Sequence, residues 1–229
     1  MEEEGQEVMI QLTLFDTVYT RKMSKAEALP WIQKYHYSKG LSNIPMIYGT
    51  YVNNILQGLV SFSCPSSEAV RQGIFGPHLK DHVMELSRLC LNPDSVFPAS
   101  KIVKGCIQAY RQERKDRGFP EVKALVSYAD PLEGHHGGVY QAMSWIYTGR
   151  TPVRFRYIYY DGTGRRRNPR QDGVNIIPSM AAERGWTAVR QKTWKHRYIK
   201  LLGSKTQKRV LRTQLKLDTY PYPKGSPQG

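Results

Sequence analysis

The fold is decided by residues 124–149, which read ALVSYADPLEGHHGGVYQAMSWIYTG. The run Ala124–Tyr128 is short and almost wholly apolar, which is typical of a strand buried in the middle of a sheet. The strand leads directly to Asp130. The glycine-rich residues 134–138 follow, and they lead into a predicted helix around Val139–Ile146. The segment therefore predicts a carboxylate at the carboxyl end of a buried strand, beside a glycine-rich loop.

Periodic segments on either side predict the other elements. Ser24 followed by helically spaced apolar residues indicates a helix. Asn53-Asn54 separates two runs rich in β-branched and aromatic residues, and it indicates a hairpin because asparagine tolerates positive φ. The predicted elements are, in order, a helix over 24–38, strands over 46–52, 55–62 and 84–91, a helix over 100–117, the strand 124–128, the helix 139–146, and strands over 154–160 and 198–202. This order predicts an α+β protein, with one mixed sheet and helices on its faces.

Positive charge is concentrated in the last third of the chain. Residues 1–149 carry 15 Lys and Arg against 15 Asp and Glu, whereas residues 150–229 carry 19 against 4, which accounts for the whole net charge of +15. A polyanionic partner is the usual reason for such segregation. Nucleic acid is the first candidate and an anionic membrane surface the second. An acidic start, Glu2-Glu3-Glu4, and the lack of an apolar run of about 18 residues favour nucleic acid and a cytoplasmic protein.

Five short segments occur in order along residues 30–150: YHYSK at 35–39, ELSRL at 85–89, SYAD at 127–130, GHxG at 134–137 and YQAxxWxYxG at 140–149. They resemble the Mom family of phage DNA-modification proteins, which are GNAT-like acyltransferases. The resemblance implies an enzyme, acting in a bacterial host cell, that converts adenine N6 in DNA to a carbamoylmethyl (acetamido) derivative and so protects the DNA from restriction. It also implies a GNAT-like catalytic core at 1–150, with the last strands of the fold and a basic nucleic-acid-binding extension at 151–229.

The same resemblance bears on cofactors. It makes an acyl donor such as acetyl-CoA the expectation, although residues 92–101 read NPDSVFPASK where GNAT enzymes carry a glycine-rich pyrophosphate-binding turn. A helix N-terminus at this point, with Lys101 and Lys104, can still accept an anion. Iron is a candidate metal, with His36 and Asp130 as candidate ligands, but the chain has neither HExxH nor CxxC spacing.

Modification of an adenine amine requires activation of a poor nucleophile and protonation of a leaving group. The expected catalytic residues are Asp130, Tyr140, Ser127, His36 and Tyr37. Asp130 would be the general base or a ligand of the amine, unless it only caps the next turn. Tyr140 would be the general acid or an orienting hydroxyl, unless it only packs on the sheet, and Ser127 would support it or be a satisfied buried hydroxyl. His36 and Tyr37 leave the first helix as base contacts or metal ligands, and the alternative for His36 is a contact with the helix dipole.

Substrate and DNA contacts complete the expected site. Glu85, Arg88 and Tyr147 are expected to bind substrate, and a cross-strand ion pair is the alternative for Glu85 and Arg88. The expected DNA-binding residues are cations with one interleaved ring: Arg154, Arg156, Arg165, Arg166, Arg167, Arg170, Arg190, Lys192, Trp194, Lys195 and Arg197. Cations hold phosphates and rings stack on unpaired bases, whereas the alternative is a solvated basic face. Because adenine N6 is paired inside a duplex, we expect the base to be flipped out or single-stranded.

Two other functions stay open on the sequence alone. One is a non-catalytic DNA-binding protein on an acyltransferase fold. The other is an N-acyltransferase that acts on an amine of RNA or protein. The side chains around Asp130 and Tyr140 discriminate between binding and catalysis, because a binder needs no open site there.

Overall fold

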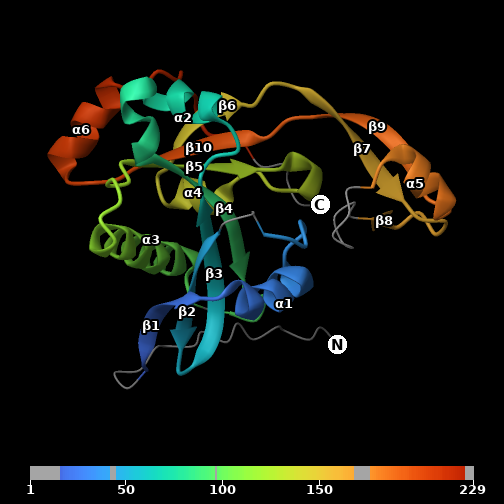
Figure 1. The fold of residues 1–229 in the computed structure, drawn as a ribbon, viewed down its shortest axis with the longest axis horizontal. Coiled ribbons are helices and arrows are strands. Elements are labelled where there is room, and N and C mark those ends of the chain that lie inside the picture. The colour runs from blue at the N-terminus through green and yellow to red at the C-terminus, as the bar shows by residue number, and fades with distance from the viewer. Residues whose placement is uncertain (1–15, 42–44, 96, 168–175, 225–229) are drawn as a thin grey trace, which may run out of the picture.

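The computed structural model describes residues 16–41, 45–95, 97–167 and 176–224. Its main sheet has seven strands and is flanked by helices, and a separate three-stranded sheet projects to one side (Figure 1). The helices are α1 (Lys25–Tyr35), α2 (Glu68–Phe75), α3 (Ala99–Asp116), α4 (Gly138–Ala142), α5 (Pro178–Glu183) and α6 (Lys205–Thr213), with 3-10 helices η1 (Pro77–His82) and η2 (Pro131–Glu133). The strands are β1 (Val18–Met23), β2 (Met46–Val52), β3 (Ile55–Ser63), β4 (Val83–Leu91), β5 (Ala124–Ala129), β6 (Ile146–Arg150), β7 (Arg154–Tyr160), β8 (Arg166–Arg167), β9 (Thr187–Thr193) and β10 (His196–Leu201). The predicted α+β class, a mixed sheet with helices on its faces, is confirmed.

The main sheet has the strand order β1-β2-β3-β4-β5-β10-β6. All neighbours are antiparallel except β4 and β5, whose parallel ladder covers three residue pairs and stops at Glu85 and Val126. One residue further on, the Ser127 hydroxyl donates a 2.8 Å hydrogen bond to the Leu86 carbonyl, so a side chain takes over where the backbone ladder ends. The carboxyl end of β5 therefore lies beside an opening in the sheet.

Two faces of the sheet are covered by different helices. Helices α3 and α4 cover a cluster that includes Phe62, Leu86 and Leu125. On the other face, α2 and α6 pack on β4, β5 and β10, and α1 packs on β2, β3 and β4. The alternation of Ala124 and Leu125 between the two clusters is that of a strand buried on both faces.

Several local predictions are confirmed. Ser24 caps α1 in a capping box with Glu27. Asn53 and Asn54 have φ of 49° and 65°, as a two-residue hairpin turn between β2 and β3 requires. The long helix α3 and the buried strand β5 also lie where the periodicity predicts them.

The predicted helix over 139–146 is wrong in its second half. Helix α4 ends at Ala142, Ser144 adopts a positive φ of 55°, and residues Ile146–Arg150 form strand β6. The pairing of β6 with β10 supplies backbone hydrogen bonds that a longer helix would have made internally. Short apolar runs with both periodicities are the cases in which local pattern does not decide between helix and strand.

Strands β7, β8 and β9 form the second sheet, in the order β8-β7-β9, and α5 packs against it. We call this unit the arm; it comprises residues 154–167 and 176–193. Figure 1 shows the arm extending away from the main sheet. At its root, the Thr151 amide donates to the Lys195 carbonyl and the Lys195 amide donates to Thr151 Oγ1, at 2.8 and 2.9 Å. The chain thus leaves the main sheet after β6 and returns to it at β10.

Across the described residues, no helix combines the length and the apolar character that spanning a membrane requires.

Candidate active site at the open end of β4 and β5

Asp130 is the centre of a polar cluster at the carboxyl end of β5. Its side chain is only 2% exposed. One carboxylate oxygen, Oδ1, accepts a 3.1 Å hydrogen bond from the Leu132 amide and so caps η2. The other, Oδ2, lies 3.5 Å from both Arg156 Nη1 and Lys195 Nζ. Asp130 therefore caps the turn with Oδ1 and faces the two cations with Oδ2.

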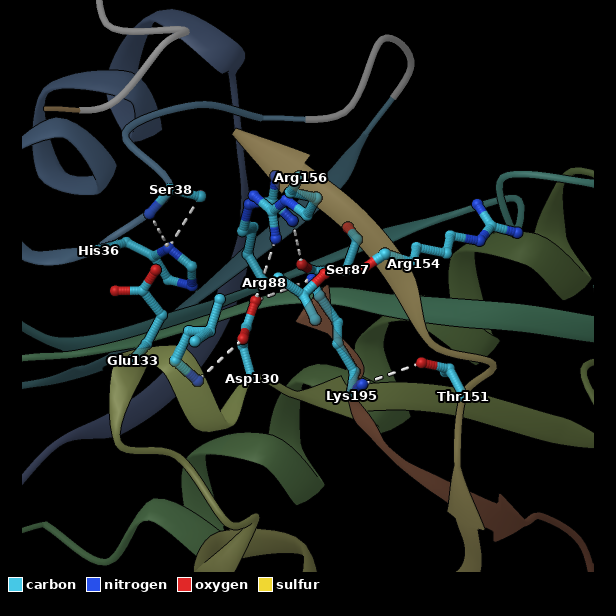
Figure 2. A network of polar contacts seen from close by, with 12 residues as sticks. His36, Ser38, Ser87, Arg88, Asp130, Glu133, Thr151, Arg154, Arg156 and Lys195 are labelled. Atoms are coloured by element: carbon cyan, nitrogen blue, oxygen red, sulfur yellow. Dashed lines mark hydrogen bonds and ion pairs between the residues drawn. The ribbon is translucent and has the colours of Figure 1, made fainter. Parts of the chain in front are cut away.

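Both cations on Asp130 come from the basic last third of the chain (Figure 2). Arg156 lies on β7 of the arm, and Lys195 lies at the arm's root. A further pair joins Arg166 of β8 to Glu133 of η2 at 2.7 Å. The arm therefore contacts the end of β5 and η2 through Arg156 and Arg166, although the rest of it extends away from the main sheet. Glu133 is a residue that the sequence reasoning did not single out, and its position next to Asp130 was the available signal.

His36 and Tyr37 approach this cluster from the end of α1. His36 Nδ1 accepts a 3.1 Å hydrogen bond from the Ser38 amide, which places the proton of a neutral ring on Nε2. Burial, with Arg88 next in effect, lowers the pKa of His36 to about 3, so His36 is neutral and does not act as a cation on the helix dipole. The Tyr37 ring lies 4.5 Å from the His36 ring and 5.5 Å from the His135 ring, centroid to centroid.

Tyr37 keeps its proton. Burial, followed by the nearby Asp130 carboxylate, raises the pKa of Tyr37 to about 12. His135 links the two segments, because its ring lies 5.5 Å from the Tyr37 ring and its amide donates a 3.1 Å hydrogen bond to the Asp130 carbonyl. The structure therefore brings together three of the expected catalytic residues, Asp130, His36 and Tyr37.

Glu85 and Arg88 on β4 form the next part of the cluster. Arg88 Nε donates a 2.8 Å hydrogen bond to the Gly40 carbonyl and so ties the segment after α1 to the sheet. Burial raises the pKa of Glu85, although Arg88, Lys195 and the Ser66 amide act against it. Glu85 is the last β4 residue in the parallel ladder, so this carboxyl lies at the opening of the sheet.

Ser127 and Tyr140 line the opening from the side of α3 and α4. Ser127 Oγ lies 2.8 Å from the Leu86 carbonyl oxygen and 2.7 Å from the Tyr140 hydroxyl oxygen. Since a carbonyl only accepts, Ser127 gives its single proton to Leu86 and Tyr140 donates to Ser127. Burial raises the pKa of Tyr140 to about 12, with smaller effects from Tyr37 and Glu85. The Tyr140 hydroxyl is thus protonated and lies near the polar cluster.

Tyr147 contacts a different group of residues. Its hydroxyl lies 2.8 Å from His196 Nδ1, and its ring packs against Tyr198 and Tyr220. Burial lowers the pKa of His196 to about 4. Tyr147 also lines a groove of about 480 Å³ together with Arg150, Arg197, Lys216 and other residues. The structure places this expected substrate-binding residue among aromatic neighbours instead of beside Asp130.

The expected DNA-binding residues divide into three groups. Those on the arm strands are Arg154, Arg156, Arg166, Arg167, Arg190 and Lys192, with Arg165 preceding β8; those at the root and on β10 are Trp194, Lys195 and Arg197; and Arg170 lies outside the described residues. Arg197 hydrogen-bonds Thr148, and the Trp194 ring lies under Arg150 at 4.1 Å. Arg167 pairs with Asp161 at 2.8 Å. Several of these cations therefore also have structural contacts.

The candidate metal ligands do not fit a metal site. In the described part of the chain, no group of three or more His, Cys, Asp or Glu side chains is arranged to hold an ion. His36 Nδ1 accepts a hydrogen bond from the Ser38 amide, and Asp130 Oδ2 already faces two cations, whose charge would repel a metal ion.

Solved structures with a similar arrangement are acetyltransferases at low identity. They include an N-acetyltransferase from Staphylococcus aureus Mu50, with 12% identity, a TM-score of 0.42, and coverage of 82% of this chain and 99% of that one. The ribosomal-protein-S18-alanine N-acetyltransferase from Escherichia coli gives 10%, 0.42, 82% and 97% for the same quantities. A GNAT family acetyltransferase from Elizabethkingia anophelis with acetyl-CoA bound gives 12%, 0.39, 82% and 98%.

No functionally curated protein matches the chain. The family model described as the Mom protein family matches residues 17–224. The match spans the main sheet, the arm and the polar cluster around Asp130, and on this basis the protein belongs to the Mom protein family.

Proposed function

We propose that this protein modifies N6 of adenine in DNA by acyl transfer, in which N6 attacks the carbonyl carbon of the donor and the bond from that carbon to the leaving group breaks. The carbamoylmethyl derivative expected for the family is joined to N6 through a methylene carbon and is not the direct product of this step. The observation that carries the proposal is the buried Asp130 carboxylate, whose Oδ2 meets Arg156 and Lys195 from the basic part of the chain. A protein that held nucleic acid by charge alone would not need a buried carboxylate at the same point. Charged groups placed together around a buried carboxylate are typical of catalytic sites.

The acceptor base would be held between Asp130 and the rings of Tyr37 and His135. A carboxylate oxygen accepts a hydrogen bond from an exocyclic amine, which is how Asp130 would fix adenine N6. The Tyr37 ring, packed on His36, offers a flat surface for a purine. Arg156 and Lys195 are then placed to hold the phosphates next to the bound nucleotide.

Glu85 is the group that we assign as proton acceptor. Its pKa is raised by burial, which brings it closer to neutral pH, where a general base is most effective. Arg88 and Lys195 lie close enough to affect its charge, and Lys195 also pairs with Asp130. In this proposal Asp130 orients the amine and Glu85 receives its proton.

Tyr140 would supply the proton that the donor's leaving group requires. A hydroxyl with a pKa of about 12 is fully protonated at neutral pH, and its proton, which is donated to Ser127 in this structure, would turn from Ser127 to the leaving group when a donor is bound. The expected acyl donor would enter from the same side as α3. Helix α3 begins at Ala99 without a side-chain cap, which leaves its first amides available for an anionic part of the donor.

Expression of the chain in a bacterium, followed by digestion of the host DNA to nucleosides and mass analysis, tests this function. The parent protein should produce a new adenine nucleoside whose added mass identifies the transferred group. Asp130→Asn should abolish it while the protein keeps its solubility and its retention on DNA. Asp81→Asn is the matched control, because Asp81 is exposed and pairs with Arg71 at 3.1 Å on the surface.

The outcomes separate the candidate functions. Unchanged DNA nucleosides in cells that contain soluble, DNA-retaining parent protein would contradict the DNA modification. Analysis of tRNA, ribosomal RNA and protein amines from the same cells would then reveal an N-acyltransferase of another specificity. A full yield of the new nucleoside from Asp130→Asn would show that the reaction takes place elsewhere on the protein.

A further inference from the structure

The arm exposes two large aromatic rings to solvent. Phe155 is 54% exposed and Tyr157 is 45% exposed, both on β7. Strands β7 and β9 form a two-stranded ribbon, in which Phe155 pairs with Lys192 and Tyr157 pairs with Arg190. Directly paired residues of antiparallel strands share a face, so these four side chains form one surface, which we call the outer face of the arm.

Cations and rings are in contact on this outer face. The Arg190 guanidinium lies 4.1 Å from the centre of the Phe155 ring, and Lys192 Nζ lies 6.0 Å from it. The described residues of the ribbon place no carboxylate on this surface, which comprises Phe155, Tyr157, Arg190 and Lys192. Its charge therefore favours an anionic partner, and its rings favour a partner with flat apolar groups.

The other face of β7 is turned toward the active site. Successive residues of a strand point to opposite faces, so Arg156 lies on the side opposite to Phe155 and Tyr157. Arg156 Nη1 reaches to 3.5 Å from Asp130 Oδ2, and Figure 2 shows it directed at the cluster. The ribbon thus separates the site from the outer face by only the thickness of a single sheet.

The arm is held rigidly enough to position its rings. Tyr159, Ile176 and Ala181 form a small buried cluster beneath α5, and the Tyr159 hydroxyl donates a 2.7 Å hydrogen bond to the Ile176 carbonyl. The reciprocal bonds of Thr151 and Lys195 fix the root. Exposed rings on a packed ribbon lose little freedom when they bind, which favours affinity.

We propose that the outer face of the arm is a stacking platform for unpaired DNA bases that flank the adenine held at Asp130. This inference rests on the proposed function, which places the target base on the other side of the ribbon. A target adenine has to leave its duplex before its N6 is accessible, and the neighbouring bases then lose stacking partners. Phe155 and Tyr157 replace those partners, while Arg190 and Lys192 neutralise the adjoining phosphates.

Binding measurements without any donor test the platform separately from the chemistry. A labelled single-stranded oligonucleotide containing 2-aminopurine beside one adenine is titrated with the parent and with Phe155→Leu, Tyr157→Leu and the double variant. Leucine keeps the apolar character but removes the ring. Phe119→Leu is the matched control, because Phe119 is 42% exposed and lies 4.9 Å from the Arg117 guanidinium, but is outside the arm at the end of α3.

We expect each arm variant to bind the oligonucleotide about tenfold more weakly, since stacking of one base on one ring has an effect of this order. The fluorescence quenching of 2-aminopurine by stacking should weaken in parallel, and the fully paired duplex should be affected less. Phe119→Leu should match the parent. Equal affinities of parent and arm variants, or an equal loss with Phe119→Leu, would overturn the platform. A larger loss for duplex than for single strand would do so too, because it would indicate a contact with the backbone alone.

This result does not depend on whether adenine is modified. If the nucleoside analysis fails but the arm variants lose stacking, the platform stands and the catalytic assignment falls. The opposite combination leaves the enzyme in place and removes the platform. Circular dichroism of each variant, compared with that of the parent, checks that the variant is folded.

Discussion

The two ends of β10 are both strongly basic, but they differ in the side chains that surround the cations. At the His196 end, Lys195 and Arg156 meet Asp130, and Arg166 of the arm pairs with Glu133. At the Leu201 end, a groove of about 600 Å³ has a lining that includes five cations, Lys200, Lys205, Lys208, Arg209 and Arg212, and no acidic or aromatic side chain. The six residues of β10 separate the two ends by about 17 Å, at roughly 3.4 Å per residue.

This comparison shows that the cations of the basic third pair with a buried carboxylate at one end of β10 and line a groove without carboxylates at the other. Cations alone bind any polyanion and cannot orient a base. At the His196 end the cations pair with Asp130, at the end of β5, and with Glu133 of η2. The α6 end lacks such partners among its lining residues. We therefore expect mutations at the two ends to differ in kind, with effects on chemistry and on acid stability confined to the first.

Apart from the loss of Asp130 itself, the largest effect is expected for Glu85→Gln, which removes the assigned proton acceptor. The single-turnover rate of adenine modification should fall by about 10²–10⁴, with DNA affinity unchanged. Because a base acts in its ionised form and burial raises the pKa of Glu85, the parent rate should fall on acidification at a higher pH than an ordinary glutamate would give. This acid limb should be missing in the variant.

Glu68→Gln is the control for this prediction, since Glu68 is exposed and pairs with Lys80 at 2.6 Å on α2. It should retain the parental rate and the parental pH profile. A Glu85→Gln rate within a few-fold of the parent would remove Glu85 from the mechanism and leave Asp130 and Glu133 as the candidate proton acceptors.

The next largest effect concerns the glycine-rich loop, which β10 holds through Tyr198. Gly137 has φ of +83°, and an added Cβ would overlap the Tyr198 ring. Gly137→Ala combines that overlap with a left-handed backbone, so we expect a loss of about 3 kcal/mol in the free energy of unfolding. Gly134→Ala has a similar φ of +71° with open space around the Cβ position, and it should lose only about 1 kcal/mol. Chemical denaturation of the two variants measures the difference, and equal losses would show that Tyr198 yields to the methyl group.

A smaller effect is expected from the buried histidines at the site end. The pKa of His36 is about 3 in the folded state and about 6.5 unfolded, so the unfolded chain binds more protons between these values. Its contribution to stability is complete above pH 6.5 and is lost as the pH falls, by about 2 kcal/mol between pH 7 and pH 5. His196 contributes with the same sign.

His36→Asn tests this, because the amide oxygen can accept the Ser38 amide as Nδ1 does but does not titrate. Its unfolding free energy should change less between pH 7 and pH 5 than that of the parent. His78→Asn, at an exposed histidine on η1, should leave the parental slope unchanged. An identical acid loss in all three proteins would assign the effect to other groups.

The sequence predicts the position of Asp130 better than the strand pairing around it. Asp130 could be placed at a strand end from the local apolar run and the turn that follows it. The insertion of β10 between β5 and β6 could not, because strand pairing between residues so far apart leaves no local pattern. For the same reason, Lys195 was predicted as a phosphate contact and its pairing with Asp130 was not.

Helix α6 was missed although its signal was present. Ser204 and Gln207 form a capping box, but Val210 and Leu211 are the only apolar side chains of this helix, too few to form the apolar stripe that identifies most helices. From the sequence alone, α6 and the arm therefore belong to one basic region, residues 150–229. The separation along β10 became visible only when both were placed on the sheet.

The smallest expected effect distinguishes the two basic ends directly. Arg190→Gln with Lys192→Gln removes two charges from the arm, and Lys205→Gln with Lys208→Gln removes two from α6. Any salt-dependent loss of DNA affinity should be a few-fold for either pair, with the slope of log affinity against log salt reduced by up to about 2. Only the arm pair should also weaken 2-aminopurine quenching at saturating protein, because Arg190 lies on the Phe155 ring.

The α6 pair should in addition leave the fold intact or slightly more stable. Burial and the neighbouring Lys208 lower the pKa of Lys200, so removal of the Lys208 charge relieves a repulsion at that end. Salt titrations of binding, together with thermal unfolding of both pairs, measure these differences. A change in quenching or in modification rate with the α6 pair would mean that the two ends of β10 act as one surface. The comparison would then have to be drawn along the whole strand, with DNA following β10 from Leu201 to the site.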